Sequence, residues 1–116
     1  MTAVTIRVAS LNDVRRSTIA AMQGDKSAHG EFITFLSFGD LHSTLTPKRM
    51  DILNAMTGKG ELTFREVASR VGRDVKAVHT DVTVLINCGI VERGGNGVIF
   101  PYDGMRFDFL LGHVAA

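Results

Sequence analysis

The chain contains little of several residue types that would indicate catalysis, metal binding or disulfide bonding. Its 116 residues include a single cysteine, one tyrosine, two prolines and no tryptophan. The lone cysteine, Cys88, cannot form a disulfide within the chain and cannot provide the clustered thiolates that a metal sensor needs. We expect Cys88 to be a buried thiol at the end of a helix, the alternative being a redox-sensing thiol.

Sequence signatures of enzymatic chemistry are also missing. No Walker-type or GxGxxG phosphate loop follows an expected strand, and no nucleophile motif occurs. The histidines are dispersed, and none is paired with Cys, Asp or Glu at metal-ligand spacing (His29, His42, His79 and His113). We therefore expect neither an enzyme nor a protein with a cofactor or a metal site.

Long apolar runs and a strong charge imbalance are absent as well. No stretch approaches the roughly 20 apolar residues that span a bilayer, and the N-terminus lacks the build of a signal peptide, so we expect no membrane association and a cytoplasmic protein. With 45% hydrophobic residues the chain can bury the core of one domain. Its net charge of +1 is low for a protein that binds nucleic acid.

Residues 63–96 nevertheless carry the pattern of a helix, a tight turn, a longer helix and a hairpin. Thr63 and Glu66 have capping-box spacing, and Gly72 can close the first helix. Asp74 is a suitable N-cap for a second helix that runs to Cys88. An apolar stripe should bury this second helix; it consists of Val75, Val78, Val82, Leu85 and Ile86.

A β-hairpin is expected after the second helix, and another helix before the first. Residues 90–92 and 98–100 are strand-like and flank the turn sequence Gly94-Gly95-Asn96-Gly97. Upstream, Thr46 is an N-cap and Pro47 stands at the first helical position. The fold class is therefore α+β, with residues 45–116 forming a winged helix-turn-helix and a C-terminal strand.

Residues 1–44 form a second unit, an N-terminal extension of strand, helix and strand. Residues 4–8 and 31–37 are strand-like, as is the C-terminal run 105–111, while residues 10–24 form a helix and residues 38–44 a short helix or turn. We expect these terminal strands to form a small sheet that carries a homodimer contact. The alternative is that they pair within one chain and complete its core.

Several segments also resemble a known family: LTPKRMDIL, TFREVASRVGRDVKAVHTDV, CGIVER and VIFPYD. They are similar to small prokaryotic winged helix-turn-helix proteins that are regarded as transcriptional regulators, distantly related to the MarR and ArsR regulators. VASLNDVRRSTIAAMQG resembles the helix that precedes their domain, so the resemblance covers nearly the whole chain, with GRDVKAVHTDV its most specific part. It implies a DNA-binding regulator, in some cases encoded beside a toxin-like partner protein. The hairpin tip GGNG departs from the more highly charged wing of the family.

The sequence thus predicts sequence-specific binding of double-stranded DNA by a transcriptional repressor, with the helix 74–88 in the major groove. The expected base contacts are Lys76, Ala77, Thr80 and Thr83, flanked by His79, and the expected phosphate contacts are Lys48, Arg49, Arg65 and Arg73. Arg93 and Asn96 are candidate wing contacts. A solvated helical surface of mixed charge would explain the same residues, and a protein-interaction module, such as an antitoxin that neutralises a partner protein, is the alternative function.

Overall fold

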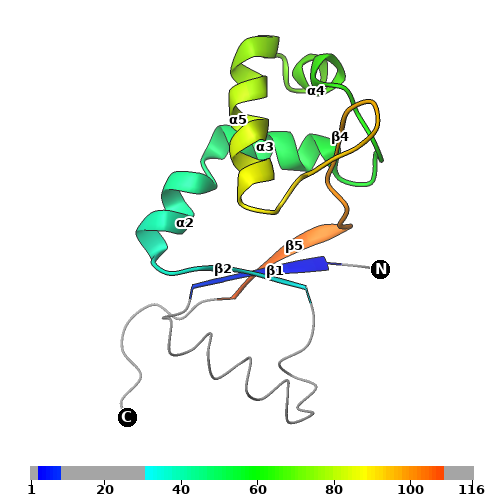
Figure 1. Ribbon diagram of the computed structural model, residues 1–116. Coiled ribbons are helices and arrows are strands. Elements are labelled where there is room, and N and C mark those ends of the chain that lie inside the picture. The colour runs from blue at the N-terminus through cyan, green and yellow to red at the C-terminus, as the bar shows by residue number, and fades with distance from the viewer. Residues whose placement is uncertain (1–2, 9–30, 109–116) are drawn as a thin grey trace, which may run out of the picture.

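Figure 1 shows the computed structural model of the chain, which describes residues 3–8 and 31–108. The described elements are β1 (Ala3–Val8), β2 (Phe32–Phe35), α2 (Phe38–Thr44), α3 (Pro47–Met56), α4 (Phe64–Val71), α5 (Val75–Asn87), β3 (Glu92–Arg93), β4 (Val98–Ile99) and β5 (Gly104–Asp108). This is the mixed α+β class that the sequence predicts. The helix expected over residues 10–24, and the end of the strand expected over 105–111, lie outside the described residues.

The three terminal strands pair with one another in a single sheet of order β2-β1-β5. Both pairings are parallel, with Ile6 opposite Ile33 on one side and Phe107 on the other. Val4 and Ile6 are fully buried, whereas the alternate residues Thr5 and Arg7 are only half-buried. The buried face of the sheet is therefore the face that supports the helices, which stand to one side of it in Figure 1.

Local signals set the bounds of the helices. The hydroxyl of Thr46 accepts from the Arg49 amide, and Pro47 occupies the first turn of α3. At α4 the capping box is complete, because Thr63 and Glu66 each accept from the backbone N–H of the other. Gly72, with a φ of 67°, ends α4 in the left-handed conformation that favours glycine.

The hairpin of β3 and β4 lies against the segment that precedes α4. Leu62 and Val98 exchange both backbone hydrogen bonds, with N···O distances of 2.9 and 2.8 Å. A Cβ atom on Gly97 would lie 2.2 Å from the carbonyl oxygen of Leu62, so only glycine permits this approach. The hairpin is thereby held beside the start of α4.

Two expectations need correction. The first hairpin strand was expected over 90–92, but Ile90 and Val91 stay bound to the end of α5, since both amides donate to the Leu85 carbonyl; β3 begins only at Glu92. Val75 was expected in the buried stripe of the second helix. It is 38% exposed because it lies in the first turn of α5, beyond the reach of the core that covers Val78 and Val82.

One apolar core joins the sheet to the helices and the hairpin. It includes Val4 and Ile6 of β1, Leu53 of α3, Leu85 of α5 and Val98 of β4. Cys88, at the end of α5, is half-buried beside this core, and its thiol donates to the Leu85 carbonyl at 3.4 Å. Burial raises the pKa of the Cys88 thiol, which keeps it in the protonated, weakly reactive form. None of the described helices is long and apolar enough to cross a membrane.

Candidate nucleic-acid interface

The outer side of α5 faces solvent along its N-terminal half. Val78, Val82 and Leu85 are fully buried and fix the orientation of the helix. The opposite side is therefore turned outward, and it carries Lys76, Ala77, His79 and Thr80, all exposed, and the half-buried Thr83. The structure thus brings the five α5 residues predicted from the sequence to one accessible surface.

The N-terminus of α5 is capped by Asp74. Its carboxylate accepts from the amides of Lys76 and Ala77, at 3.1 and 3.4 Å. This satisfies two of the free N–H groups of the first turn and places a negative charge at the positive end of the helix. The Asp74 carboxylate therefore competes with any phosphate for this end of α5.

The two threonine hydroxyls on this surface donate their protons to the helix itself. Thr80 Oγ1 donates to the Lys76 carbonyl at 3.2 Å, and Thr83 Oγ1 donates to the His79 carbonyl at 2.7 Å. Each oxygen keeps lone pairs directed away from the backbone. In this arrangement the hydroxyls present acceptors, which suit the amino groups of adenine or cytosine in a major groove.

His79 is held by an aromatic contact with α4. Its ring lies 4.6 Å from the ring of Phe64, centroid to centroid, with the planes tilted by 39°. The contact links the middle of α5 to the first residue of α4 and restricts the rotamers of His79. His79 therefore forms the border of the surface, with its ring against Phe64.

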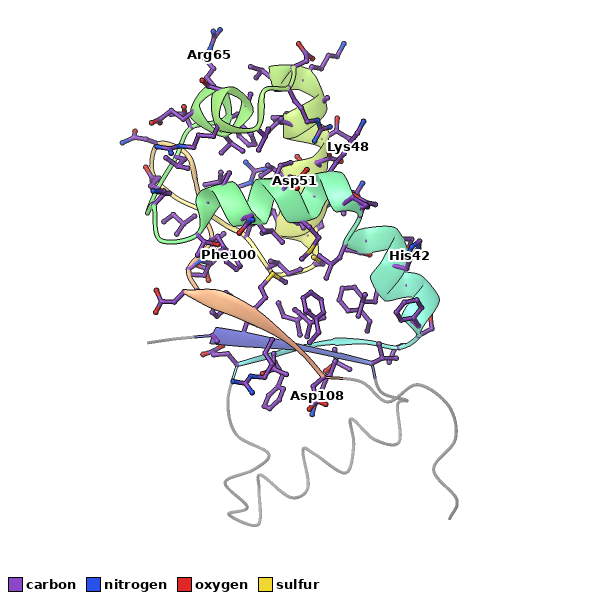
Figure 2. The ribbon with its side chains drawn as sticks, turned by 180° about the vertical axis from the view of Figure 1, so that it is seen from behind. His42, Lys48, Asp51, Arg65, Phe100 and Asp108 are labelled. Carbon is purple, nitrogen blue, oxygen red and sulfur yellow. The ribbon has the colours of Figure 1, made fainter. Side chains whose placement is uncertain are left out.

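Lys48 and Arg65 supply exposed cations from the neighbouring helices. Arg65 projects outward from the first turn of α4, and Lys48 lies near the start of α3, as Figure 2 shows. Neither forms an ion pair with another described residue, and the same is true of Lys76. These three side chains are free to meet phosphates.

Arg49 and Arg73 are placed differently, because both are bound to Asp81 of α5. Arg49 Nε lies 3.0 Å from one Asp81 oxygen, and Arg73 NH2 lies 2.8 Å from the other. All three side chains are largely buried, with exposed fractions between 15 and 21%. Sequence reasoning assigned both arginines to phosphates, whereas the structure engages both guanidinium groups in an internal ion-pair cluster.

The charge of Asp81 is stabilised by its partners. Burial by itself raises the pKa of the Asp81 carboxyl, but the hydrogen bonds from Arg73 and Arg49 outweigh burial and hold the pKa below its ordinary value. Arg49 also donates to the carbonyls of Ser43 and Thr44, each at 3.1 Å. The cluster therefore fixes α5 against the α2–α3 junction and the turn before α5.

The hairpin presents Arg93 and Asn96 at the surface, but with a carboxylate beside them. Both residues are exposed. Glu61 Oε2 accepts from the Asn96 amide at 2.9 Å, and a Cβ atom on Gly94 would collide with the same carboxylate. Glu61 thus shapes the hairpin tip and lowers its positive potential.

Two features of this surface were missed by sequence reasoning. Glu61 lies 35 residues from its partner Asn96, so no local pattern could reveal their contact. Val75 is an exposed apolar side chain one residue before Lys76, and its place in a helical stripe suggested burial. Within residues 3–8 and 31–108, no three His, Cys, Asp or Glu side chains gather closely enough to hold a metal ion.

Comparison with known proteins gives one family match. Residues 44–107, more than half of the chain, match the HVO_A0114 family. The matched region runs from the end of α2 into β5 and contains every residue of the surface described above. No curated protein matches the chain.

Proposed function

We propose that this chain, which belongs to the HVO_A0114 family, binds specific sequences of double-stranded DNA and represses transcription by occupying an operator. The observation that carries this proposal is the outward-facing surface of α5, which presents short polar side chains and one lysine. The opposite side of the helix is buried in the core. Such a surface lets a helix approach base edges closely.

The arrangement of the neighbouring elements supports a winged helix-turn-helix. α4 and α5 are separated only by residues 72–74, α3 precedes them, and the β3–β4 hairpin follows α5. The hairpin pairs with Leu62 just before α4, which positions it next to the helix pair. In this fold the second helix of the pair enters the major groove and the hairpin lies beside it.

The surface residues would have different roles in binding DNA. Lys76, Ala77, Thr80 and Thr83 meet base edges, His79 flanks them, and Val75 supplies an apolar contact suited to a thymine methyl group. Lys48 and Arg65 contact phosphates, and Arg93 and Asn96 contact the backbone from the wing. Arg49 and Arg73 act indirectly, by orienting α5 through Asp81.

One observation favours a second function, that of a module that binds another protein. The Asp81 cluster holds two of the cations nearest to α5 in ion pairs and offsets one of their two charges, and the chain carries a net charge of only +1. A surface of this kind can also dock a protein, such as a toxin that the chain would neutralise. DNA binding differs from docking in its steep dependence on salt.

Fluorescence anisotropy with genomic duplexes at several salt concentrations tests the proposal. We expect affinity to fall linearly on a log–log plot as salt rises, with a slope that reflects the phosphate contacts. A flat salt dependence, or no binding to any duplex, would favour the docking module.

The Lys76→Ala variant locates the contact. If Lys76 reads a base, we expect roughly a 5- to 100-fold loss of affinity for the preferred duplex and little loss for others; if it holds a phosphate, the loss is uniform and the salt slope falls by about one. Arg7→Gln is the matched control, since it removes one positive charge from β1 in the sheet, away from α5 (Figure 1). Unchanged affinity and slope in Lys76→Ala would show that α5 is not the DNA-binding helix.

A further inference from the structure

β5 forms one edge of the three-stranded sheet. In the order β2-β1-β5, β1 is its only strand neighbour among the described residues. Arg106 and Asp108 lie on one face of β5, and Phe107 lies on the other, the face on which its register partner Ile6 is buried. Phe107 is nonetheless 42% exposed. An edge of this kind is a template for pairing with another strand.

Symmetry limits how two copies of β5 can pair. A two-fold axis perpendicular to the sheet makes the two strands antiparallel, and residues directly opposite one another must then lie on the same face. Centring the pair on Arg106 sets Arg106 against Arg106, and centring it on Asp108 sets Asp108 against Asp108. Centring it on Phe107 instead places Arg106 opposite Asp108 twice and packs the two Phe107 rings together. Opposite charges across strands stabilise a pair, and like charges oppose it.

We propose that the β5 edge binds a second copy of this chain, antiparallel and centred on Phe107. The charge sequence of β5 is complementary to itself in this register, which identifies the occupant as another β5. Phe107 also lines a groove of about 360 Å³ between α3 and β5, together with Met50 and Met105. The other edge strand, β2, has the sequence Phe-Ile-Thr-Phe, in which no charge can select a register.

The resulting dimer has one continuous sheet of order β2-β1-β5-β5-β1-β2. Because its two-fold axis is perpendicular to the sheet, the helices of both copies stand on the same side (Figure 1). Two α5 helices would then be available to one duplex, a consequence that rests on the proposed DNA-binding function. The dimer itself does not depend on DNA and is tested without it.

Charge reversal in the full chain tests the register, with sedimentation equilibrium as the measurement. The unaltered chain should dimerise at micromolar concentrations. Arg106→Asp and Asp108→Arg should each weaken dimerisation about tenfold or more, because each creates two like-charge pairs across the axis. The double variant Arg106→Asp/Asp108→Arg restores opposite charges across the axis and should recover part of the affinity; the recovery stays incomplete because residue 108 faces Arg7 of β1 within the same chain. Lys59→Asp, the same reversal at an exposed loop residue, should have no effect.

Disulfide trapping in a Cys88→Ser background tests the central residue. Phe107→Cys should oxidise to a covalent dimer, because opposite Cα atoms lie about 4.5–5.5 Å apart, within the reach of a disulfide. Arg106→Cys should not form a covalent dimer. In this register residue 106 lies opposite residue 108 of the second copy, so the two residues 106 are diagonal neighbours, separated by more than about 7 Å.

If the chain remained monomeric at about 100 µM, the proposal would be wrong. Arg106 and Asp108 would then serve to prevent pairing at the β5 edge. A dimer that the double variant does not recover, or that cross-links through Arg106→Cys rather than Phe107→Cys, would overturn the register. None of these results depends on whether the chain binds DNA.

Discussion

Asp81 shows how one side chain can both organise a surface and reduce its charge. Its two oxygens bind guanidinium groups from α3 and from the turn before α5. Removing either arginine would leave a largely buried carboxylate with one partner fewer, and removing Asp81 would leave two guanidinium groups unpaired. Arg49 and Arg73 therefore orient α5 through Asp81, and their charges are less available near the proposed DNA surface.

Asp81→Asn should therefore lower the free energy of unfolding by roughly 2 kcal/mol near neutral pH, because it replaces charge-assisted hydrogen bonds with weaker ones. The pKa of Asp81 is lower in the folded chain than its ordinary value of 3.8. Its contribution is thus fully present above about pH 4 and is lost as the pH falls through the folded-state pKa. Urea unfolding at several pH values should show that the difference in the free energy of unfolding between the unaltered chain and Asp81→Asn becomes smaller below about pH 4.

The matched control for this experiment is Asp51→Asn, an exposed carboxylate of α3 that forms no ion pair with a described residue. Its effect should stay within about 0.5 kcal/mol. If Asp51→Asn and Asp81→Asn lowered the free energy of unfolding equally, or if the effect of Asp81→Asn did not depend on pH, the ion-pair cluster would not be the source of stability.

At the scale of elements, the helices were predictable because their signals are local. Thr63 with Glu66, Pro47 after Thr46, and Gly72 each act within about one helical turn, and the sequence alone placed these ends. The pairing of the terminal strands was left open, because which strands meet depends on contacts between residues far apart in the sequence. The surface of α5 was predictable from its periodicity, whereas the engagement of Arg49 by Asp81 was not, since 32 residues separate them.

The position of the hairpin depends on Gly97. Gly97 carries no side chain where the chain passes the Leu62 carbonyl, and the two hydrogen bonds of the Leu62–Val98 bridge follow directly after it. A methyl group at residue 97 must displace backbone rather than a flexible side chain. The hairpin and the segment before α4 would then separate.

Gly97→Ala should consequently lower the free energy of unfolding by about 1–3 kcal/mol, as expected for an overpacked site. The change should also increase amide hydrogen exchange at Leu62 and Val98. Gly95→Ala is the matched control at the same tip: its Cβ would meet no atom within 4 Å, so its stability should be nearly unchanged. Equal exchange rates at Leu62 and Val98 in the two variants would refute the role given to Gly97.

At the scale of the whole molecule, the core crosses the boundary that the sequence suggested at residue 44. Val4 and Ile6 belong to the same apolar cluster as Leu53, Leu85 and Val98. β5, at the far end of the chain, is paired with β1 through five residue positions. The sheet and the helices should therefore unfold together, whatever separate tasks they perform.

Ile6→Ala tests this coupling, since it removes three carbon atoms from a fully buried site in β1. We expect the free energy of unfolding to fall by roughly 2–5 kcal/mol. Two probes should also shift together in urea, which is the main test of the coupling. Far-UV circular dichroism reports mainly on the helices, and fluorescence reports on Tyr102, the only tyrosine, which lies beside β5. Ile6→Val should give the same coincidence at a smaller loss of about 0.5–1.5 kcal/mol, even if Ile6→Ala fails to fold. Leu36→Ala, at a side chain that is 53% exposed, should leave both probes almost unchanged. A Tyr102 transition that moved while the helical transition stayed in place would mean that the sheet and the helices fold as separate units.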